Sequence, residues 1–331
     1  MKVAVYYNNQ DIRLEERSIP RISGGEILVK MKASGICGTD IHIYRGEYLG
    51  PYPVIPGHEF SGVVAQVGSG VKRFKPGDRV AVEPNISCDN CANCLSNRQN
   101  FCLNWQAVGV TRPGGMAQYV LAPEKTAFDI GSLPFEQGAF MEPLSCVLHG
   151  MERLNAALAD QILILGAGPI GCLLLQVARL QGAARLTAVD MNRSRAEAAQ
   201  AYGANDIRFS LDDLPVDHYD AIIDATGSIA VLERTLDFVR PGGKVLWFGV
   251  PPSGQPMRLE PFKVFHKGLT VLSSFTSVRN SIQALDLLKA GRISVTGLVS
   301  HQLSLEELQR GIEEIEQGVP GVMKILIRPD A

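Results

Sequence analysis

The chain has 331 residues, of which 46% are hydrophobic and 20% are charged, and its formal net charge is −2. This length favours two domains, and the composition is typical of a soluble globular protein. Because the net charge is near zero and no long basic or acidic block occurs, nothing favours a nucleic-acid or membrane-surface partner. The first residues, MKVAVYYNNQDIRLEE, lack an apolar signal core, so we expect a cytoplasmic protein.

Residues 1–35 alternate apolar and polar side chains and predict short antiparallel strands, and similar strands recur up to about residue 122. Frequent glycine and proline residues between them are typical of a small β-barrel. Within this region Cys37, His58 and Glu59 are suitable zinc ligands, and three protein ligands leave a fourth position for water or substrate. Their spacing alone leaves open a buried cysteine, a structural histidine and a surface glutamate.

Four of the seven cysteines, Cys88, Cys91, Cys94 and Cys102, are crowded into one short stretch. In a reducing compartment this crowding favours metal over disulfides. Four thiolates complete a tetrahedral zinc shell without an open position, so we predict a structural zinc. An iron–sulfur cluster would favour C-x2-C-x2-C-x3-C-P, whereas here the last gap is seven residues and Leu103 follows. Free buried cysteines are the alternative.

Residues 161–190 read as strand, glycine-rich turn, helix and second strand, with Asp190 at the end. The turn, Gly166-Ala167-Gly168-Pro169-Ile170-Gly171, has the G-x-G-x-x-G pattern of dinucleotide-binding proteins. Its glycines permit the tight turn, the approach of the pyrophosphate to the backbone and the close packing of helix on strand. The helix N-terminus offers free N–H groups to the phosphates. Asp190 would accept from ribose hydroxyls and repel a 2′-phosphate, so we expect NAD, although Arg193 and Arg195 are near.

Strands and helices alternate through the middle of the chain and predict an α/β fold with a parallel, doubly wound sheet. The expected strands lie near 162–166, 185–190, 219–224, 244–249 and 269–273. The expected helices lie near 169–181, 193–202, 229–239 and 279–291. After residue 292 we expect an acidic helix followed by a strand, VMKILIRP, and this segment has the strand-rich pattern of the N-terminal region.

The segments GICGTDIH, GHEFSGVV, the four-cysteine loop, MEPL and GAGPIG occur in this order and together cover nearly the whole chain. In combination they resemble the zinc-dependent medium-chain alcohol dehydrogenases, in the branch of sorbitol and other polyol dehydrogenases. The resemblance implies a GroES-like β-barrel catalytic domain, residues 1–150 plus 292–331, with two zinc sites. It implies an inserted NAD-binding Rossmann domain, residues 151–291, with the active site in the cleft between domains. Relatives pair through sheet edges, so we expect a homodimer or homotetramer.

The resemblance also assigns metal ligands. Cys37, His58 and Glu59 match the ligands of the catalytic zinc. Glu142, in MEPL, matches the acid that lies beside this metal in the polyol branch, either directly or through water. A helix-capping or exposed glutamate is the alternative for Glu142.

The remaining implied roles concern the proton and the cofactor. Thr39 and His42 match the hydroxyl and imidazole that pass the substrate proton towards solvent, with a plain structural histidine as the alternative for His42. Arg195 matches an arginine that packs along the adenine, and Phe248-Gly249-Val250 matches the segment beside the nicotinamide. In the implied reaction zinc acts as a Lewis acid on the alcohol, whose carbon gives a hydride to NAD.

Two departures leave the substrate open. Sorbitol dehydrogenases have an arginine–tyrosine pair where this chain reads Ser274-Phe275-Thr276-Ser277, and CGTDIHIY is closer to threonine dehydrogenases. We predict an NAD-dependent zinc oxidoreductase of a small secondary alcohol, a polyol or sugar alcohol with or without a phosphate. The alternatives are a threonine-type amino-alcohol dehydrogenase and a non-catalytic NAD-binding regulatory protein. A regulatory protein would need no catalytic zinc ligands, and a zinc-free quinone reductase would lack both cysteine loop and ligand triad.

Overall fold

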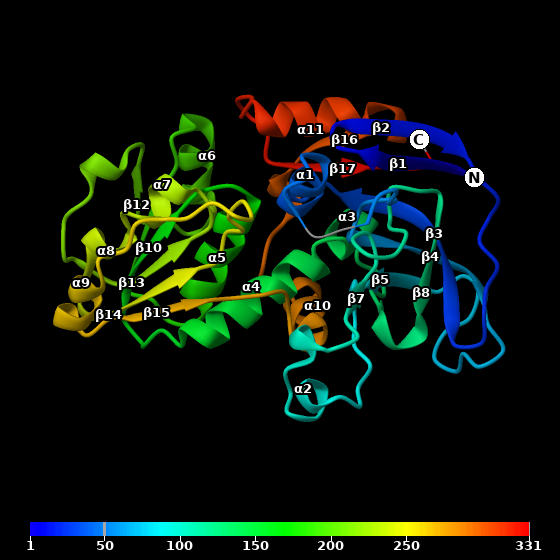
Figure 1. Cartoon of the computed structure of the whole chain (residues 1–331), viewed down its shortest axis with the longest axis horizontal. Coiled ribbons are helices and arrows are strands. Elements are labelled where there is room, and N and C mark those ends of the chain that lie inside the picture. The colour runs from blue at the N-terminus through cyan, green and yellow to red at the C-terminus, as the bar shows by residue number, and fades with distance from the viewer. Residues whose placement is uncertain (49–50, 331) are drawn as a thin grey trace. The chain divides into compact units, whose positions relative to one another are not determined.

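The computed structural model describes residues 1–48 and 51–330. Contacts within the chain divide it into two compact units, both drawn in Figure 1. Unit 1 comprises Met1–Ser145 and Ser277–Ala331, and unit 2 comprises Cys146–Thr276. The assignment of residues 1–150 plus 292–331 to a catalytic domain and of residues 151–291 to an NAD-binding domain stays a prediction.

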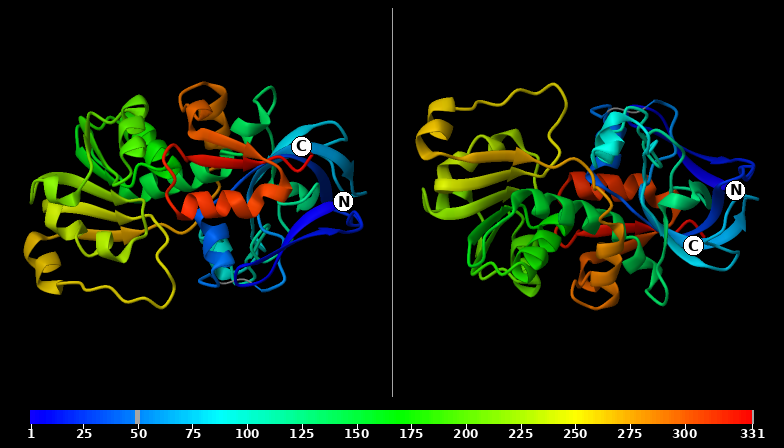
Figure 2. Two further views of the ribbon diagram at one scale, coloured as in Figure 1. Left: turned by 90° about the horizontal axis from the view of Figure 1, so that it is seen from above. Right: turned by 90° about the horizontal axis from the view of Figure 1, so that it is seen from below.

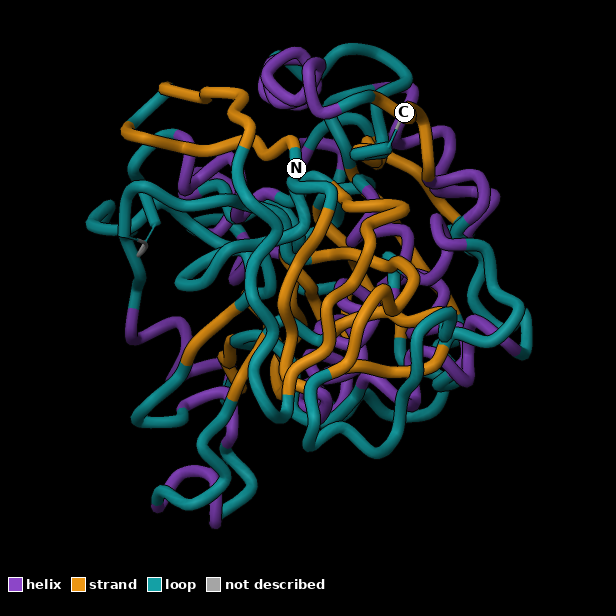
Figure 3. The backbone as a smooth tube through the Cα atoms, turned by 90° about the vertical axis from the view of Figure 1, so that its right-hand side faces the viewer, coloured by secondary structure: helices purple, strands orange, loops and turns teal. Residues whose placement is uncertain are grey.

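Unit 1 is built around a sheet that has seven strands within the described residues. The strand order is β16-β17-β3-β4-β5-β9, with β8 pairing the first half of β3. Strands are drawn in orange in Figure 3, which shows the side of the molecule nearest this sheet. The bounds are β3 Glu26–Gly35, β4 Glu59–Val67, β5 Arg79–Val82, β8 Tyr119–Pro123, β9 Ala127–Asp129, β16 Val299–Leu303 and β17 Lys324–Ile327. The pairing of β17 with the end of β3 explains why the C-terminal segment belongs to this unit.

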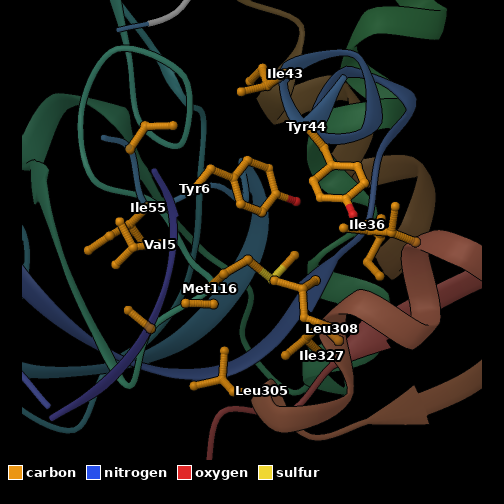
Figure 4. Packing of buried hydrophobic residues seen from close by; sticks show 14 of the residues in the cluster. Val5, Tyr6, Ile36, Ile43, Tyr44, Ile55, Met116, Leu305, Leu308 and Ile327 are labelled. Atoms are coloured by element: carbon orange, nitrogen blue, oxygen red, sulfur yellow. The ribbon is translucent and has the colours of Figure 1, made fainter. Parts of the chain in front are cut away.

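Two short ladders flank this sheet, β1 (Lys2–Asn8) with β2 (Asp11–Glu16) and β6 (Asn85–Ile86) with β7 (Gln106–Ala107). The antiparallel strands predicted for the N-terminal residues are present, but β1 buries four consecutive residues, from Val3 to Tyr6, instead of alternating buried and exposed side chains. Their apolar side chains enter a core to which distant segments contribute: Tyr6 faces Tyr44, Val5 lies beside Ile55, and Leu308 and Ile327 belong to the same cluster (Figure 4). The N-terminal hairpin thus shares a core with both α1 (Gly38–Tyr44) and the C-terminal segment.

Unit 2 is a parallel sheet in the order β12-β11-β10-β13-β14-β15, with helices on both faces (Figure 2). The bounds are β10 Gln161–Leu165, β11 Arg185–Val189, β12 Asp206–Arg208, β13 Tyr219–Asp224, β14 Val239–Trp247 and β15 Thr270–Ser273. The five predicted strands are all present, and the α/β, doubly wound fold is confirmed. The prediction missed β12, a three-residue edge strand that is only half-buried and carries little apolar pattern.

The helices predicted near 169–181 and 193–202 are confirmed as α5 and α6, the latter continued by a 3-10 turn. The helix predicted near 229–239 is divided into α7 and α8 at the capping residues Glu233 and Arg234. The bounds are α1 Gly38–Tyr44, α2 Ala92–Leu95, α3 Phe135–Gly138, α4 Met141–Leu154, α5 Pro169–Leu180, α6 Arg193–Ala198, α7 Ile229–Leu232, α8 Thr235–Phe238, α9 Pro261–Lys267, α10 Ser281–Lys289 and α11 Leu308–Glu316. Among the described residues, no helix combines the length and apolarity needed to cross a bilayer.

Candidate active site and metal centres

The three candidate ligands of a catalytic zinc meet at one end of the β3–β4 pair. Gly35, the last residue of β3, lies opposite Glu59, the first residue of β4, and Cys37 follows as the N-cap of α1. This register brings the ligand atoms of Cys37, His58 and Glu59 within 4.8 Å of one another. A side chain at Gly35 would collide with the Glu59 carboxylate and with Lys324, so glycine keeps this space open.

This cluster is buried and rich in charge. Glu59 is 1% exposed and Asp40 is fully buried, while Lys324 on β17 forms an ion pair with Glu59. Two carboxyl groups, a thiol, an imidazole and an ammonium group are thus enclosed together, away from bulk water. Buried polar and charged groups of this kind require partners, and a metal ion is one such partner. Donor types and spacing therefore fit zinc.

Asp40 contacts the candidate zinc ligands, and the sequence interpretation did not include it. Its Oδ2 accepts the backbone N–H of Cys37 at 2.8 Å, and its Oδ1 accepts that of Gly57 at 3.1 Å. The same Oδ1 lies 3.4 Å from Nδ1 of His58. A carboxylate behind a metal-ligating histidine fixes the ring and leaves its other nitrogen for the metal. The sequence does contain a pattern that points to Asp40, because this residue stands three positions after the helix N-cap Cys37, which is the spacing of a capping box.

The pKa directions in the protein alone reflect this crowding of charge. Burial raises the pKa of the Cys37 thiol, and the charge of Glu59 adds to the effect. Burial works to lower the pKa of His58, but the charges of Asp40 and Cys37 outweigh it and raise this pKa well above its usual value. Burial likewise works to lower the pKa of Lys324, and the charge of Glu59 reverses this into a raised pKa. Metal binding here is therefore coupled to proton release.

The other predicted site residues of unit 1 lie on α1 and α4. Glu142 is 7% exposed in the first turn of α4, and among the described residues it lies outside the group whose ligand atoms come within 4.8 Å. Thr39 and His42 lie three residues apart on α1 and so share one face of the helix. Nδ1 of His42 lies 2.8 Å from Oε2 of Glu47, a second acid that the sequence interpretation did not include. The roles of Thr39, His42 and Glu142 stay predictions.

The four cysteines of the loop form a second cluster, with all ligand atoms within 4.8 Å. The sulfur of Cys91 lies 3.4 Å from that of Cys94 and 4.0 Å from that of Cys102, and the sulfur of Cys88 lies 4.0 Å from that of Cys94. Zinc–sulfur bonds of about 2.3 Å in a tetrahedron place the sulfurs about 3.8 Å apart. The observed separations bracket this value, so the loop fits a four-thiolate zinc.

Backbone hydrogen bonds favour the thiolate form of two cysteines in this loop. Backbone N–H groups of Leu103 and Cys94 lower the pKa of Cys91 to about 6, and that of Asn90 lowers the pKa of Cys88. Burial raises the pKa of Cys94 to about 12, and the neighbouring thiols contribute. Four adjacent thiolates repel one another without a cation, so the full set of charges forms only around a metal.

In unit 2 the glycine-rich turn joins β10 to α5 in the manner predicted. Gly166 has φ +96°, a conformation that favours glycine, and a Cβ at Gly171 would collide with the backbone of Gly166. Pro169 is the first residue of α5, with Gly168 as its N-cap and Ile170 after it. A Cβ at Gly168 would meet nothing within 4 Å, so the space beyond the helix N-terminus is open to a phosphate.

Two aspartates organise the loops at the carboxyl ends of the parallel strands. Asp190 accepts the backbone N–H of Ala167 at 2.9 Å through Oδ2 and that of Asn192 at 2.8 Å through Oδ1, and the remaining lone pairs suit ribose hydroxyls. Asp224, which the sequence interpretation missed, is fully buried and accepts the backbone N–H groups of Thr226 and Gly227. These geometries fit a dinucleotide at this edge of the sheet.

The segments predicted to contact the two ends of the cofactor lie at the same edge. The backbone N–H groups of Phe248 and Gly249 donate to the carbonyl of Asp224, and Val250, which follows, is 45% exposed. Arg195 lies in α6, whose N-cap Asn192 accepts its backbone N–H at 3.4 Å. The contacts of Arg195, Phe248, Gly249 and Val250 with NAD stay predictions.

Comparison with known proteins agrees with this geometry. The model of the alcohol dehydrogenase GroES-like domain matches residues 23–132, and that of the zinc-binding dehydrogenase domain matches residues 169–290. The chain is 31% identical to D-arabinitol dehydrogenase 1 of Uromyces fabae, over 99% of this chain and 97% of the relative. The chain belongs to the zinc-binding alcohol dehydrogenase family. It is also 37% identical to D-altritol 5-dehydrogenase of Agrobacterium fabrum, over 89% of this chain and 90% of the relative.

A solved structure extends the likeness to the whole fold. A protein from Sinorhizobium meliloti 1021, described as a zinc-binding dehydrogenase bound to NADP, superposes with a TM-score of 0.93 at 34% identity, over 99% of both chains. The family, its polyol branch, the GroES-like and Rossmann fold and the zinc oxidoreductase class are thereby confirmed. Family membership supports zinc and a nicotinamide cofactor for this chain.

Proposed function

We propose that this medium-chain dehydrogenase oxidises a secondary alcohol of the polyol or sugar-alcohol class, phosphorylated or not, with NAD as hydride acceptor. The observation that carries the proposal is the buried cluster of Cys37, His58 and Glu59 backed by Asp40. It occurs in a chain that is similar over nearly its full length to dehydrogenases of arabinitol and altritol. A regulatory protein that only binds NAD has no use for such a cluster, and a threonine substrate has less support from these relatives.

Zinc held by Cys37, His58 and Glu59 would act as a Lewis acid and lower the pKa of the substrate alcohol. Bound NAD would supply the hydride acceptor. Asp40, whose Oδ1 lies 3.4 Å from Nδ1 of His58, would orient this ring once zinc is bound, and Lys324 pairs with Glu59. Thr39 and His42 would accept the alcohol proton in turn and carry it towards solvent, because a hydroxyl and an imidazole on one helix face form a short relay.

We propose two zinc ions per chain, the second in the four-cysteine loop, where it is structural. Thiolate ligands of this kind persist in a reducing compartment, which supports a cytoplasmic location. We also propose a homodimer or homotetramer. Its support is β15, an edge strand of the unit 2 sheet, and the nearby α9, on which Phe262 and Phe265 are 65% and 80% exposed. Light scattering tests this, with a particle mass equal to one chain of 35.9 kDa as the contradicting result.

NAD preference has its own test at Asp190. We expect Asp190→Ala to weaken NADH binding and strengthen NADPH binding, changing the ratio of the two dissociation constants by about tenfold or more, because the carboxylate no longer repels the 2′-phosphate. Fluorescence titration of each reduced cofactor measures the ratio without turnover. Asp206→Ala, which removes a carboxylate paired with Arg185 on the neighbouring strands, is the control. An unchanged ratio in Asp190→Ala would remove this residue from the ribose contact.

The reaction itself is tested by following NAD and NADP reduction with zinc-loaded protein. The panel contains D-arabinitol, D-altritol, sorbitol, their phosphate esters and L-threonine, and Cys37→Ser is the control. We expect turnover of at least one polyol that is lost in Cys37→Ser. Turnover of L-threonine alone would establish the amino-alcohol alternative, and no turnover with any alcohol would contradict the proposal.

A further inference from the structure

The turn after α1 places an acid against the histidine of the proposed relay. α1 ends at the C-cap Arg45, and the backbone N–H of Gly46 donates to the carbonyl of Ile43 at 2.9 Å. The backbone N–H of Glu47 donates to the carbonyl of His42 at 2.8 Å. These two bonds define a Schellman motif, in which Gly46 adopts the left-handed conformation with φ +74°.

A Schellman motif brings two side chains together, those of the residue three positions before the cap and of the second residue after it. These are frequently both hydrophobic. Here they are His42 and Glu47, and Nδ1 of His42 lies 2.8 Å from Oε2 of Glu47. Both side chains are partly shielded, at 17% and 31% exposure, so water does not dominate the contact. The local backbone motif itself therefore sets the pairing.

The contact decides which ring nitrogen of His42 carries a proton. A neutral imidazole has one N–H donor and one acceptor nitrogen, and a carboxylate only accepts. The proton next to Glu47 therefore resides on Nδ1, which leaves the lone pair on Nε2. We propose that Glu47 is a positioning residue that holds His42 in this tautomer and orientation, so that Nε2 receives the substrate proton. This inference rests on the proposed function, in which His42 belongs to the relay.

The surrounding charges favour His42 as the main partner of Glu47. Arg45 approaches Glu47 only to 4.0 Å, and its Nε donates to Oε1 of Glu316 on α11 at 2.5 Å. Glu313 and Glu316 also face Tyr44, whose pKa is raised by burial and by these two acids. Arg45 is thus held by α11, whereas Glu47 is held by the turn and directed at His42.

Tautomers of histidine are distinguished by the nitrogen-15 shifts of the two ring nitrogens, which provides a test independent of turnover. The chain has six histidines, and the difference spectrum of His42→Gln assigns the signals of His42 in the zinc-loaded full chain. We expect the Nδ1–H form in the wild type and a shift towards the Nε2–H form in Glu47→Ala. Glu47→Gln retains a hydrogen-bond acceptor, so it should keep more of the Nδ1–H form. An Nε2–H form in the wild type, or the same form in all variants, overturns the proposal.

Kinetics test the functional consequence. We expect Glu47→Ala to lower kcat about tenfold, with KM for NAD unchanged, because general acid–base transfer depends on the orientation of the histidine. In a His42→Ala background the same substitution should have no further effect, since Glu47 acts only through His42. Glu306→Ala, which removes a carboxylate that accepts from Lys2 elsewhere in unit 1, is the matched control and should keep full kcat.

The outcomes separate this inference from the proposed function. An equal loss of kcat in both backgrounds means a structural role and overturns the inference, while the zinc chemistry tested by Cys37→Ser stands. Full kcat in His42→Ala removes the relay role and this inference with it, but again leaves the dehydrogenase activity intact. Loss of the proposed function itself would instead show as a wild-type chain that reduces neither NAD nor NADP with any alcohol.

Discussion

The two candidate metal-binding clusters of unit 1 are assembled from the chain in opposite ways. The four-cysteine cluster comes from one continuous loop, in which the spacing along the chain already sets the spacing of the sulfurs. The cluster of Cys37, His58 and Glu59 exists only because β3 and β4 pair in a register that places Gly35 opposite Glu59. The first site is therefore readable from the sequence alone, and the second depends on the fold.

The two clusters also differ in their environments. Backbone N–H groups surround the loop thiols, as in the bond from Cys88 to the sulfur of Cys102 at 3.2 Å. Charged side chains surround the buried cluster, namely Asp40, on the helix that Cys37 caps, and Lys324 on the distant strand β17. Four identical ligands close the coordination shell of zinc, whereas three mixed ligands leave a position for substrate. This difference predicts that a zinc in the four-cysteine loop stabilises the fold and that a zinc at Cys37, His58 and Glu59 takes part in the reaction.

The largest effect is expected for Cys37→Ser. Loss of a thiolate ligand removes the catalytic zinc, and with it the Lewis acid that contributes several kcal/mol to the reaction, so kcat/KM should fall about a thousandfold or more. Elemental analysis should find one zinc per chain instead of two, and the melting temperature should change little. If Cys37→Ser kept its activity, or if it unfolded as readily as a variant of the loop cysteines, the assignment of the catalytic role to this cluster and of the structural role to the loop would be contradicted.

Cys94→Ser should show the opposite behaviour. Cys94 is 4% exposed, and without it the loop loses its metal and the mutual constraint of four ligands, so the protein should lose about 3 kcal/mol of unfolding free energy. Chemical denaturation measures this change, and kcat of the folded fraction should stay within about tenfold of the wild type. Full stability together with two zinc ions per chain would exclude the structural role.

Asp40→Asn tests the charged surroundings of the buried cluster. The amide is isosteric, but it removes the charge that faces His58 at 3.4 Å, so zinc affinity should fall about tenfold to a hundredfold. Competition with a chelator measures this affinity, and the loop zinc serves as the internal control because Asp40 does not contact the loop cysteines. Equal loss of both metals would indicate unfolding instead of a local effect.

The same contrast explains how much the sequence predicted. The glycine-rich turn, the loop cysteines and α5 were predicted because each depends on residues close together in the chain. Lys324 was missed because it belongs to β17, and only the pairing of β17 with β3 brings it to Glu59. No local pattern carries such information.

Asp40 and Glu47 were missed for a different reason. Each lies within five residues of a residue that was predicted, and each follows from the helix-end motifs of α1, a capping box at its start and a Schellman motif at its end. The short edge strand β12 was missed because its residues are half-buried and lack an apolar pattern. A prediction that includes helix-end motifs would have found both acids. The strand β12 can be recognised only from its pairing with the parallel strand β11.

The smallest effect is expected for Cys172→Ala, a cysteine outside both clusters. Cys172 is fully buried in α5, where its sulfur contacts the carbonyl of Ala167 at 3.5 Å, and burial raises its pKa to about 12. It behaves as a small apolar side chain, so its removal should cost about 1 kcal/mol of stability through a minor packing defect. Zinc content should remain two per chain and kcat should be unchanged. Loss of a metal equivalent would mean that metal binding extends beyond the two clusters, and the contrast between a local and a fold-dependent site would then be incomplete.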